Sequence, residues 1–135
     1  MTLERATALD SLQKAIYERL TQEITDVQTF DYVEQGQATP YIEIGEDVTI
    51  PDDTKDIPGE IIQVTIHAFS NEKGKKEVKG IIGRIETALT KSDLNLTADG
   101  FTLLETVSDE KQTLTDEEDE IEHGVIKVSF KIQKS

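Results

Sequence analysis

Residues 30–45 read FDYVEQGQATPYIEIG, and this stretch decides the fold class of the chain. Apolar and polar residues alternate in each half, which puts Phe30 and Tyr32 on one face of a strand and Ile42 and Ile44 on one face of the next. A glycine and a proline between the two halves indicate a turn. The stretch therefore predicts two short, half-buried strands whose aromatic and apolar side chains hold the sheet together.

Helical periodicity precedes this stretch and returns later in the chain. Leu9, Leu12, Ile16 and Leu20 recur at steps of three and four residues, as on the buried face of an amphipathic helix. Elsewhere, alternation or a second helical stripe of apolar residues marks the other elements. The predicted elements outside residues 30–45 are helices over about residues 3–23 and 74–91 and strands over about 60–69, 101–107 and 125–133.

The order of these elements is α-β-β-β-α-β-β. It predicts the α+β class, with a mainly antiparallel sheet of about five strands and two helices packed on one face. Gly80 and Gly83 each cost the second helix about 1 kcal/mol relative to alanine, so we expect the helix to approach the sheet or a neighbour closely there. The whole chain, residues 1–135, is expected to form a single domain.

The composition excludes several classes of protein. No cysteine is present, so the chain has no disulfide, no thiolate nucleophile and no cysteine-based metal site. Asp and Glu number 28 against 14 Lys and Arg, and the resulting formal net charge of −14 argues against nucleic-acid binding. No apolar segment approaches the roughly 20 residues of a membrane span, and the polar N-terminal residues do not resemble a secretion signal. We therefore expect a soluble protein with no membrane partner.

Two polar segments are expected to be flexible loops that contact other proteins. Residues 48–59 contain two prolines and a glycine, and residues 109–122 concentrate carboxylates, as in a mobile loop or the tip of a long hairpin. The candidate interaction residues are Asp52, Asp53, Lys55, Asp56, Asp116, Glu117, Glu118, Asp119 and Glu120.

A candidate basic contact for an acidic partner surface lies between the two segments. It consists of Lys73, Lys75, Lys76 and Lys79, which alternate with acidic residues. A solvated loop and first helical turn is the plainer interpretation of this cluster.

The sequence contains no recognisable catalytic, metal or cofactor motif. His67 and His123 are the only histidines, and we interpret both as ordinary surface or half-buried imidazoles. They lack the spacing of His-based metal motifs, and residues 93–104 depart from a calcium-binding loop at Ala98 and Leu104. We therefore predict no catalytic residue, no metal ligand and no cofactor.

The arrangement of these segments resembles a family of phage proteins. A helix is followed by FDYV at residues 30–33 and QATPYIEIG at residues 37–45, and a strand that ends in HAFS at residues 67–70 leads into the helix of residues 74–89. This pattern covers nearly the whole chain and resembles the tail-completion or tail-to-head joining proteins of long-tailed bacteriophages, the siphoviruses.

The resemblance implies a small, non-enzymatic subunit that forms a homo-oligomeric ring, of six copies, at the head-proximal end of the tail. It implies the head-connector or stopper protein and the tail tube as partners, and DNA as passing cargo with no specific binding. It also implies a location in the virion, after assembly in the host cytoplasm. Two alternatives stay open, namely a generic intracellular adaptor of the same fold and a small enzyme with an unrecognised site.

Overall fold

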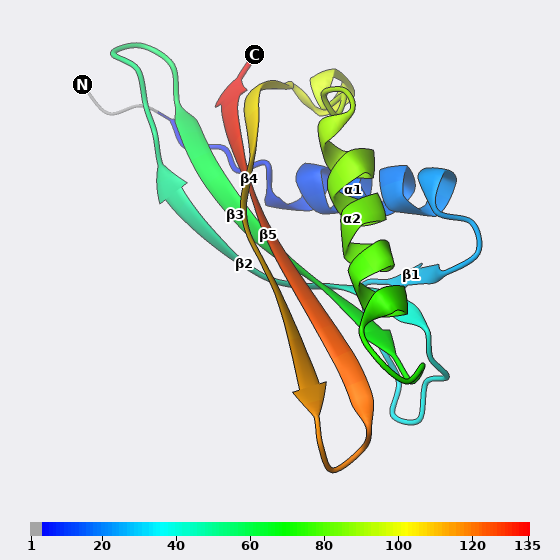
Figure 1. Ribbon diagram of the computed structural model, residues 1–135. Helices are drawn as coiled ribbons and strands as arrows, with labels where there is room; N and C mark the ends of the chain where they lie inside the picture. The colour runs from blue at the N-terminus through cyan, green and yellow to red at the C-terminus, as the bar shows by residue number, and fades with distance from the viewer. Residues whose placement is uncertain (1–3) are drawn as a thin grey trace.

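In the computed structural model, which describes residues 4–135, two helices pack on one face of a five-stranded sheet (Figure 1). The elements in chain order are α1 (Leu9–Glu23), β1 (Gln28–Phe30), β2 (Tyr41–Pro51), β3 (Gly59–Ser70), α2 (Lys76–Thr90), a 3₁₀ turn η1 (Thr97–Asp99), β4 (Phe101–Asp116) and β5 (Ile121–Lys134). The predicted α+β class and the order α-β-β-β-α-β-β are confirmed.

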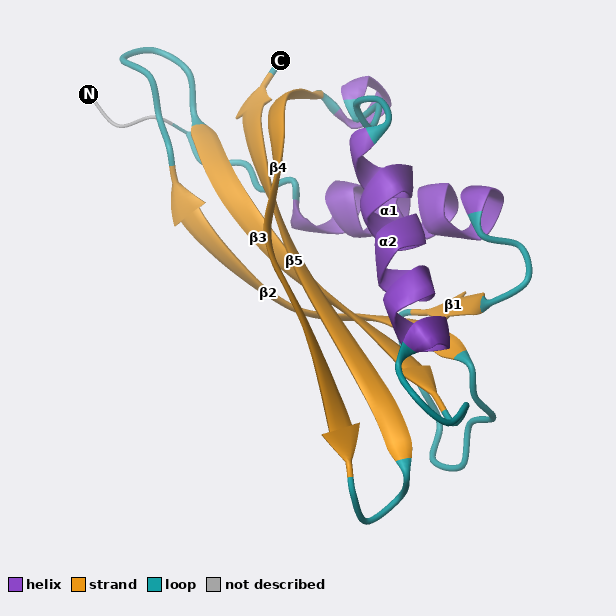
Figure 2. Cartoon of the chain, in the orientation of Figure 1, coloured by secondary structure: helices purple, strands orange, loops and turns teal. Residues whose placement is uncertain are grey.

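The strands lie side by side in the order β1-β2-β3-β5-β4 (Figure 2). Strands β2, β3, β5 and β4 pair antiparallel with their neighbours, whereas the short β1 runs parallel to β2. The ladder between β3 and β5 is the most regular, since it continues without a shift from Gly59 opposite Gln133 to Ser70 opposite Glu122. The sheet is therefore mainly antiparallel and is built around this central pair.

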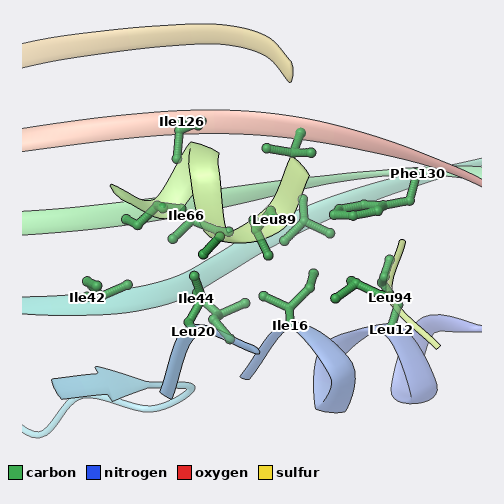
Figure 3. Packing of buried hydrophobic residues seen from close by; sticks show 14 of the residues in the cluster. Leu12, Ile16, Leu20, Ile42, Ile44, Ile66, Leu89, Leu94, Ile126 and Phe130 are labelled. Carbon is green, nitrogen blue, oxygen red and sulfur yellow. The ribbon is translucent and has the colours of Figure 1, made fainter. Parts of the chain in front are cut away.

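The core lies between the helices and one face of the sheet, because alternate residues of β3 and β5 point towards the helices. Figure 3 shows Leu12, Ile16 and Leu20 of α1 directed towards the sheet and α2. Each fully buried aliphatic side chain contributes about 1.5–3 kcal/mol relative to an exposed one. The largest side chains of this core with almost no exposure are Phe130, Leu12, Ile16, Leu20, Ile42, Ile62, Ile66, Ile85, Leu89, Ile126, Ile132 and Val78.

Helix α1 starts six residues later than predicted, and the predicted start at Leu3 lies outside the described residues. The segment before Leu9 is held by the sheet instead. The carboxylate of Glu60 accepts hydrogen bonds from the Ala8 backbone N–H (2.7 Å) and from the Thr7 hydroxyl (2.8 Å). A carboxylate at this place supplies the acceptor that a helix N-terminus requires and opposes its positive dipole end.

The first strand lies earlier than predicted, because β1 ends at Phe30 and residues 31–40, where Tyr32 was expected in a strand, form a loop. A parallel pair cannot be closed by a tight turn, so these residues carry the chain back to the start of β2. Tyr32, expected to pack in the sheet, is 74% exposed on this loop. Ile42 and Ile44 are buried as predicted.

Strands take up the ends of the first predicted loop, residues 48–59, and most of the second, residues 109–122. Strand β2 continues to Pro51 and β3 begins at Gly59, so the connection between them is only residues 52–58. Strands β4 and β5 extend to Asp116 and Ile121 and leave only residues 117–120 as a turn, so the hairpin alternative for residues 109–122 is confirmed. Whether these connections are mobile stays a prediction.

Gly80 and Gly83 do not lie at a close approach within the chain, because a Cβ atom at either position would have no other atom within 4 Å. The close approach occurs at Gly124 of β5, where a Cβ atom would stand 2.6 Å from Cγ1 of Ile82 and 3.1 Å from Cγ2 of Val78. Glycine at this position lets α2 lie directly on β5.

We therefore expect Gly124→Val to force α2 away from β5 and to lower the free energy of unfolding by about 1–3 kcal/mol. Urea denaturation followed by circular dichroism measures this loss. The matched control is Gly83→Ala on the outer face of α2, which should raise stability by about 0.5–1 kcal/mol through helix propensity. Equal stability of Gly124→Val and the unmodified chain would contradict the packing described above.

Candidate functional site

The connection between β2 and β3 is tied down by the first two candidate residues. Asp53 pairs with Arg5 at 2.6 Å and accepts the Gly59 backbone N–H at 2.9 Å. The hydrogen bond from Arg5, and after it the one from Gly59, holds the pKa of Asp53 below its ordinary value. Asp52 lies 3.6 Å from the ammonium group of Lys131 in β5. These two carboxylates therefore serve the subunit itself.

The other two candidate residues of this connection point away from the body of the protein. Lys55 and Asp56 are exposed, and their side chains make no hydrogen bond or ion pair with any residue of the described range 4–135. Between them and the strands, the Thr54 hydroxyl accepts the Ile57 backbone N–H at 3.1 Å and closes a small turn. Lys55 and Asp56 are thus the part of the loop that another protein can reach.

The acidic run forms the turn of the β4–β5 hairpin. Asp116 accepts backbone hydrogen bonds from Glu118 (3.1 Å) and Asp119 (3.4 Å), which shapes the turn. Glu120 closes it with a backbone φ of 54°. The side chains of residues 117–120 are exposed, so their charges gather at the far end of the longest hairpin. This end projects beyond α2 and the rest of the sheet in Figure 1.

The four lysines of the candidate basic contact do not act together. Lys75 turns towards the hairpin, where its ammonium group donates to the Thr115 hydroxyl at 2.9 Å and lies 3.5 Å from the carboxylate of Glu122. Within the described part of the chain, Lys73, Lys76 and Lys79 have no such partner and are exposed. Lys75 therefore joins the start of α2 to the hairpin, and the remaining three face solvent.

The face of the sheet opposite the helices, which we call the open face, has no layer over it (Figure 1). Several of its apolar side chains are exposed, by 41–60% of their surface. They are Val48 and Ile50 of β2 and Val107 and Leu114 of β4. Strands β3 and β5 separate the two pairs, so the four side chains lie apart on this face.

Aromatic rings form a continuous row on one end of the open face. Phe30 meets Tyr41 edge-on at 6.1 Å, Tyr41 lies 4.9 Å from Phe69, and Phe69 stacks on His123 at 4.4 Å between ring centroids. The row crosses β1, β2, β3 and β5 and contributes about 0.5–1.5 kcal/mol per pair beyond the buried area. Tyr41 therefore does help to hold the sheet, as the sequence predicts.

The two histidines are half-buried, as the sequence predicts, and they contact each other. His67 Nδ1 lies 2.8 Å from His123 Nε2, and His67 Nε2 lies 2.7 Å from a carboxylate oxygen of Glu46. The sequence could show that both histidines occupy the same face of their strands. The sequence does not give the register of β3 and β5, in which His67 pairs with Val125, two residues from His123. That register comes from the structure.

No catalytic group is recognisable in the hollows described for residues 4–135. A hollow of about 530 Å³ lies beside the start of α2 and includes neither histidine. Within residues 4–135 no cluster of three or more His, Cys, Asp or Glu side chains is arranged to hold a metal ion. No helix in this range has the length and apolar character needed to cross a membrane. The features that stand out are surfaces suited to contacts between proteins.

Comparison with known proteins gives a consistent result. The family model described as tail completion protein gp17 matches residues 14–133. Tail completion protein gp17 of Bacillus phage SPP1 is 30% identical over 129 residues, which cover 93% of this chain and 94% of that protein.

Two solved structures have a similar fold. The structure of bacteriophage SPP1 gp17 superposes with a TM-score of 0.60 at 30% identity and covers 91% of this chain and 89% of that one. A chain in the virion of a native gene transfer agent particle gives a TM-score of 0.79 and covers 95% of this chain and 99% of that one. Its sequence identity is 16%, so this second likeness concerns the fold alone.

The contacts of Asp53 lead to a prediction for the β2–β3 connection. Asp53→Ala removes the partner of Arg5 and the acceptor of the Gly59 N–H, so amide hydrogen exchange at residues 52–59 should become several-fold faster. Asp56→Ala, the control, removes an equal charge from the same loop but no contact, and exchange should stay unchanged. Equal exchange rates in the two variants would show that Asp53 does not hold the loop.

Proposed function

The chain belongs to the tail completion protein gp17 family, and on this premise we propose that it forms a ring at the head-proximal end of a phage tail. As a member of this family it is a structural tail protein of the virion. The ring, with six copies as its proposed stoichiometry, would join the tail tube to the head connector or stopper protein and let DNA pass. The proposed role is non-enzymatic and follows assembly in the host cytoplasm.

The observation that carries the proposal is the placement of the two free loop ends at opposite ends of the sheet (Figure 1). The β2–β3 connection precedes Gly59, which pairs with Gln133, and the hairpin turn lies beside Ser70, at the other end of β3. Since β3 has 12 residues, the two loop ends are separated by about 40 Å. A subunit inserted between two structures requires contact regions at two distant ends.

We assign one end to the head side and the other to the tail side. At one end Lys55 and Asp56 are available, and at the other end the carboxylates of residues 117–120 are available. Both sets are anchored at their bases by Asp53 and Asp116, so contact with a partner needs no rearrangement of the sheet. The exposed apolar residues of the open face provide further surface for contacts between copies.

The net charge of −14 fits the passage of DNA through such a ring. Carboxylates that face a channel repel phosphates, so the genome does not adhere to the wall. This is the opposite of a nucleic-acid-binding surface, which needs lysine and arginine along the backbone path. A lumen lined by lysine in the assembled ring would contradict this part of the proposal.

We expect purified protein, added to tails that lack it, to produce a terminal ring and to restore joining to heads. Negative-stain electron microscopy counts joined particles, and native mass spectrometry of the ring gives the number of copies. Absence of both ring and joining would overturn the proposed function.

The hairpin turn can be tested separately. Neutralising it with Glu117→Gln, Glu118→Gln, Asp119→Asn and Glu120→Gln should reduce joining about tenfold, the effect of roughly 1.4 kcal/mol in binding. The control carries the same change of charge elsewhere on the exposed surface, as Glu4→Gln, Asp10→Asn, Glu18→Gln and Glu34→Gln. Equal joining by both variants would remove the turn from the contact region while leaving the ring itself in place.

A further inference from the structure

Three side chains from three strands form one hydrogen-bonded chain on the open face. Glu46 of β2 contacts His67 of β3 at 2.7 Å, and His67 contacts His123 of β5 at 2.8 Å. The side chain of His67 is 17% exposed, whereas that of Glu46 is 68% exposed. This series of hydrogen bonds therefore leads from the solvent-exposed Glu46 to the half-buried histidines. It joins three strands that are far apart in the sequence.

The local backbone is arranged around this chain. Between Ile44 and Asp47 the ladder of β2 shifts, so that two residues, Gly45 and Glu46, oppose the single residue Thr65 of β3. A bulge of this kind redirects a side chain, here that of Glu46. A Cβ atom at position 45 would stand 2.6 Å from Cδ2 of His67, so glycine makes room for the imidazole.

The ring of His123 is also fixed in place. It stacks on Phe69 with an interplanar angle of 13° and a centroid distance of 4.4 Å. Register places it beside Phe69 on β3 and Leu114 on β4. The ring is thus held on both sides within the sheet, with Nε2 directed at His67.

The number of protons on the two imidazoles determines which hydrogen bonds this arrangement can form. A carboxylate only accepts, so His67 Nε2 must donate to Glu46. With two neutral rings, His67 Nδ1 accepts the N–H of His123 Nε2. With one added proton, His67 donates from both nitrogens and His123 Nε2 becomes the acceptor. With a second added proton, two N–H donors and two positive charges meet at this contact, and no acceptor remains.

We propose that Glu46, His67 and His123 form a pH-sensitive clasp across β2, β3 and β5, closed with at most one added proton and opened by a second. Opening releases the bulge of β2 from β3 and frees the first residues of β5, where the long hairpin begins. Acidification therefore loosens the contacts between strands on the open face. It requires neither a ring nor any partner, and it stands apart from the proposed function.

The charged groups around the clasp favour the state in which the two imidazoles share one added proton. Glu43 of β2 lies opposite His67 in the ladder. Lys127 of β5 interacts with Glu46 and is drawn towards Glu110 of β4, at 3.7 Å. Burial, and after it the charge of Glu43, raises the pKa of the neighbouring Tyr41, which therefore stays neutral. Both helices lie on the other face of the sheet and add no charge here.

The direction of the pH dependence follows from the same contacts. Burial, and after it His67, lowers the pKa of His123, while Glu46 acts in the opposite sense. The hydrogen bond from His67 lowers the pKa of Glu46, which therefore stays ionised in mild acid. The unfolded chain accepts a proton on His123 near pH 6.5, before the folded state does. The stability from the neutral ring is therefore complete above about pH 6.5 and is lost as the pH falls through the lower folded-state value.

Nuclear magnetic resonance titration of the two imidazoles in the unmodified chain tests the clasp directly. We expect both rings to respond together in a first step and a second step to follow only at clearly lower pH, as in a coupled pair. Glu46→Gln should move the first step to lower pH, because the counter-charge is lost. Glu34→Gln, an exposed carboxylate on the loop of residues 31–40, is the control and should leave both steps unchanged.

Amide hydrogen exchange provides the second readout. Protection of residues 43–47 and 121–125 should fall as the pH drops through the second step, after correction for intrinsic exchange, and this fall should be absent in His123→Gln. Two rings that titrate independently near pH 6.5 in the unmodified chain would overturn the proposal, even if the His123 variant does not fold. A first step that is the same in Glu46→Gln would overturn it as well.

Discussion

Contact between α2 and the central strand pair β3 and β5 is the constraint on which the rest of the structure depends. The pair buries a side chain at every second residue on the helix side, and Gly124 lets α2 lie directly on it. Helix α1 then packs beside α2, where the guanidinium of Arg19 donates to the carbonyl oxygens of Ala88 (2.9 Å) and Ser92 (3.0 Å). The Ala88 carbonyl belongs to the last turn of α2, where carbonyls have no partner within the helix, and Ser92 follows the end of the helix. One close contact thus positions both helices.

The two helices cover only one face of the sheet. Polar and aromatic contacts between strands stabilise the open face. Asp109 of β4 accepts from Gln63 at 3.0 Å and from Ser129, and Lys131 lies near Asp52. Exposed ion pairs of this type contribute little individually, typically less than 1 kcal/mol. Their combined effect is to fix the register of a sheet whose second face has no hydrophobic layer, while apolar side chains such as Ile50 stay available to another protein.

Most of the fold could be predicted from the sequence because β3, β5 and α2 have clear periodicities. The extension of β4 could not, since an edge strand gains its backbone hydrogen bonds from β5 and needs no apolar alternation between Asp109 and Asp116. The parallel partner of β1 and the contact between His67 and His123 depend on strand order and register, which local patterns do not encode. The predicted loops of residues 48–59 and 109–122 shrink to connections of residues 52–58 and 117–120, because strand pairing extends into both segments.

The acidic residues lie in two kinds of environment, and this explains how a subunit with an excess of negative charge can be stable. Two carboxylates of the body have close partners, namely Glu60 at the start of α1 and Glu86, which accepts from Lys111 and Ser108. For Glu86 these hydrogen bonds, led by that of Lys111, lower the pKa of the carboxyl, so the charge favours the folded state at neutral pH. The carboxylates of residues 117–120 lie at the end of a long hairpin, where water screens their mutual repulsion. The fold therefore tolerates this charge because it is concentrated where it costs least and where a partner can approach it.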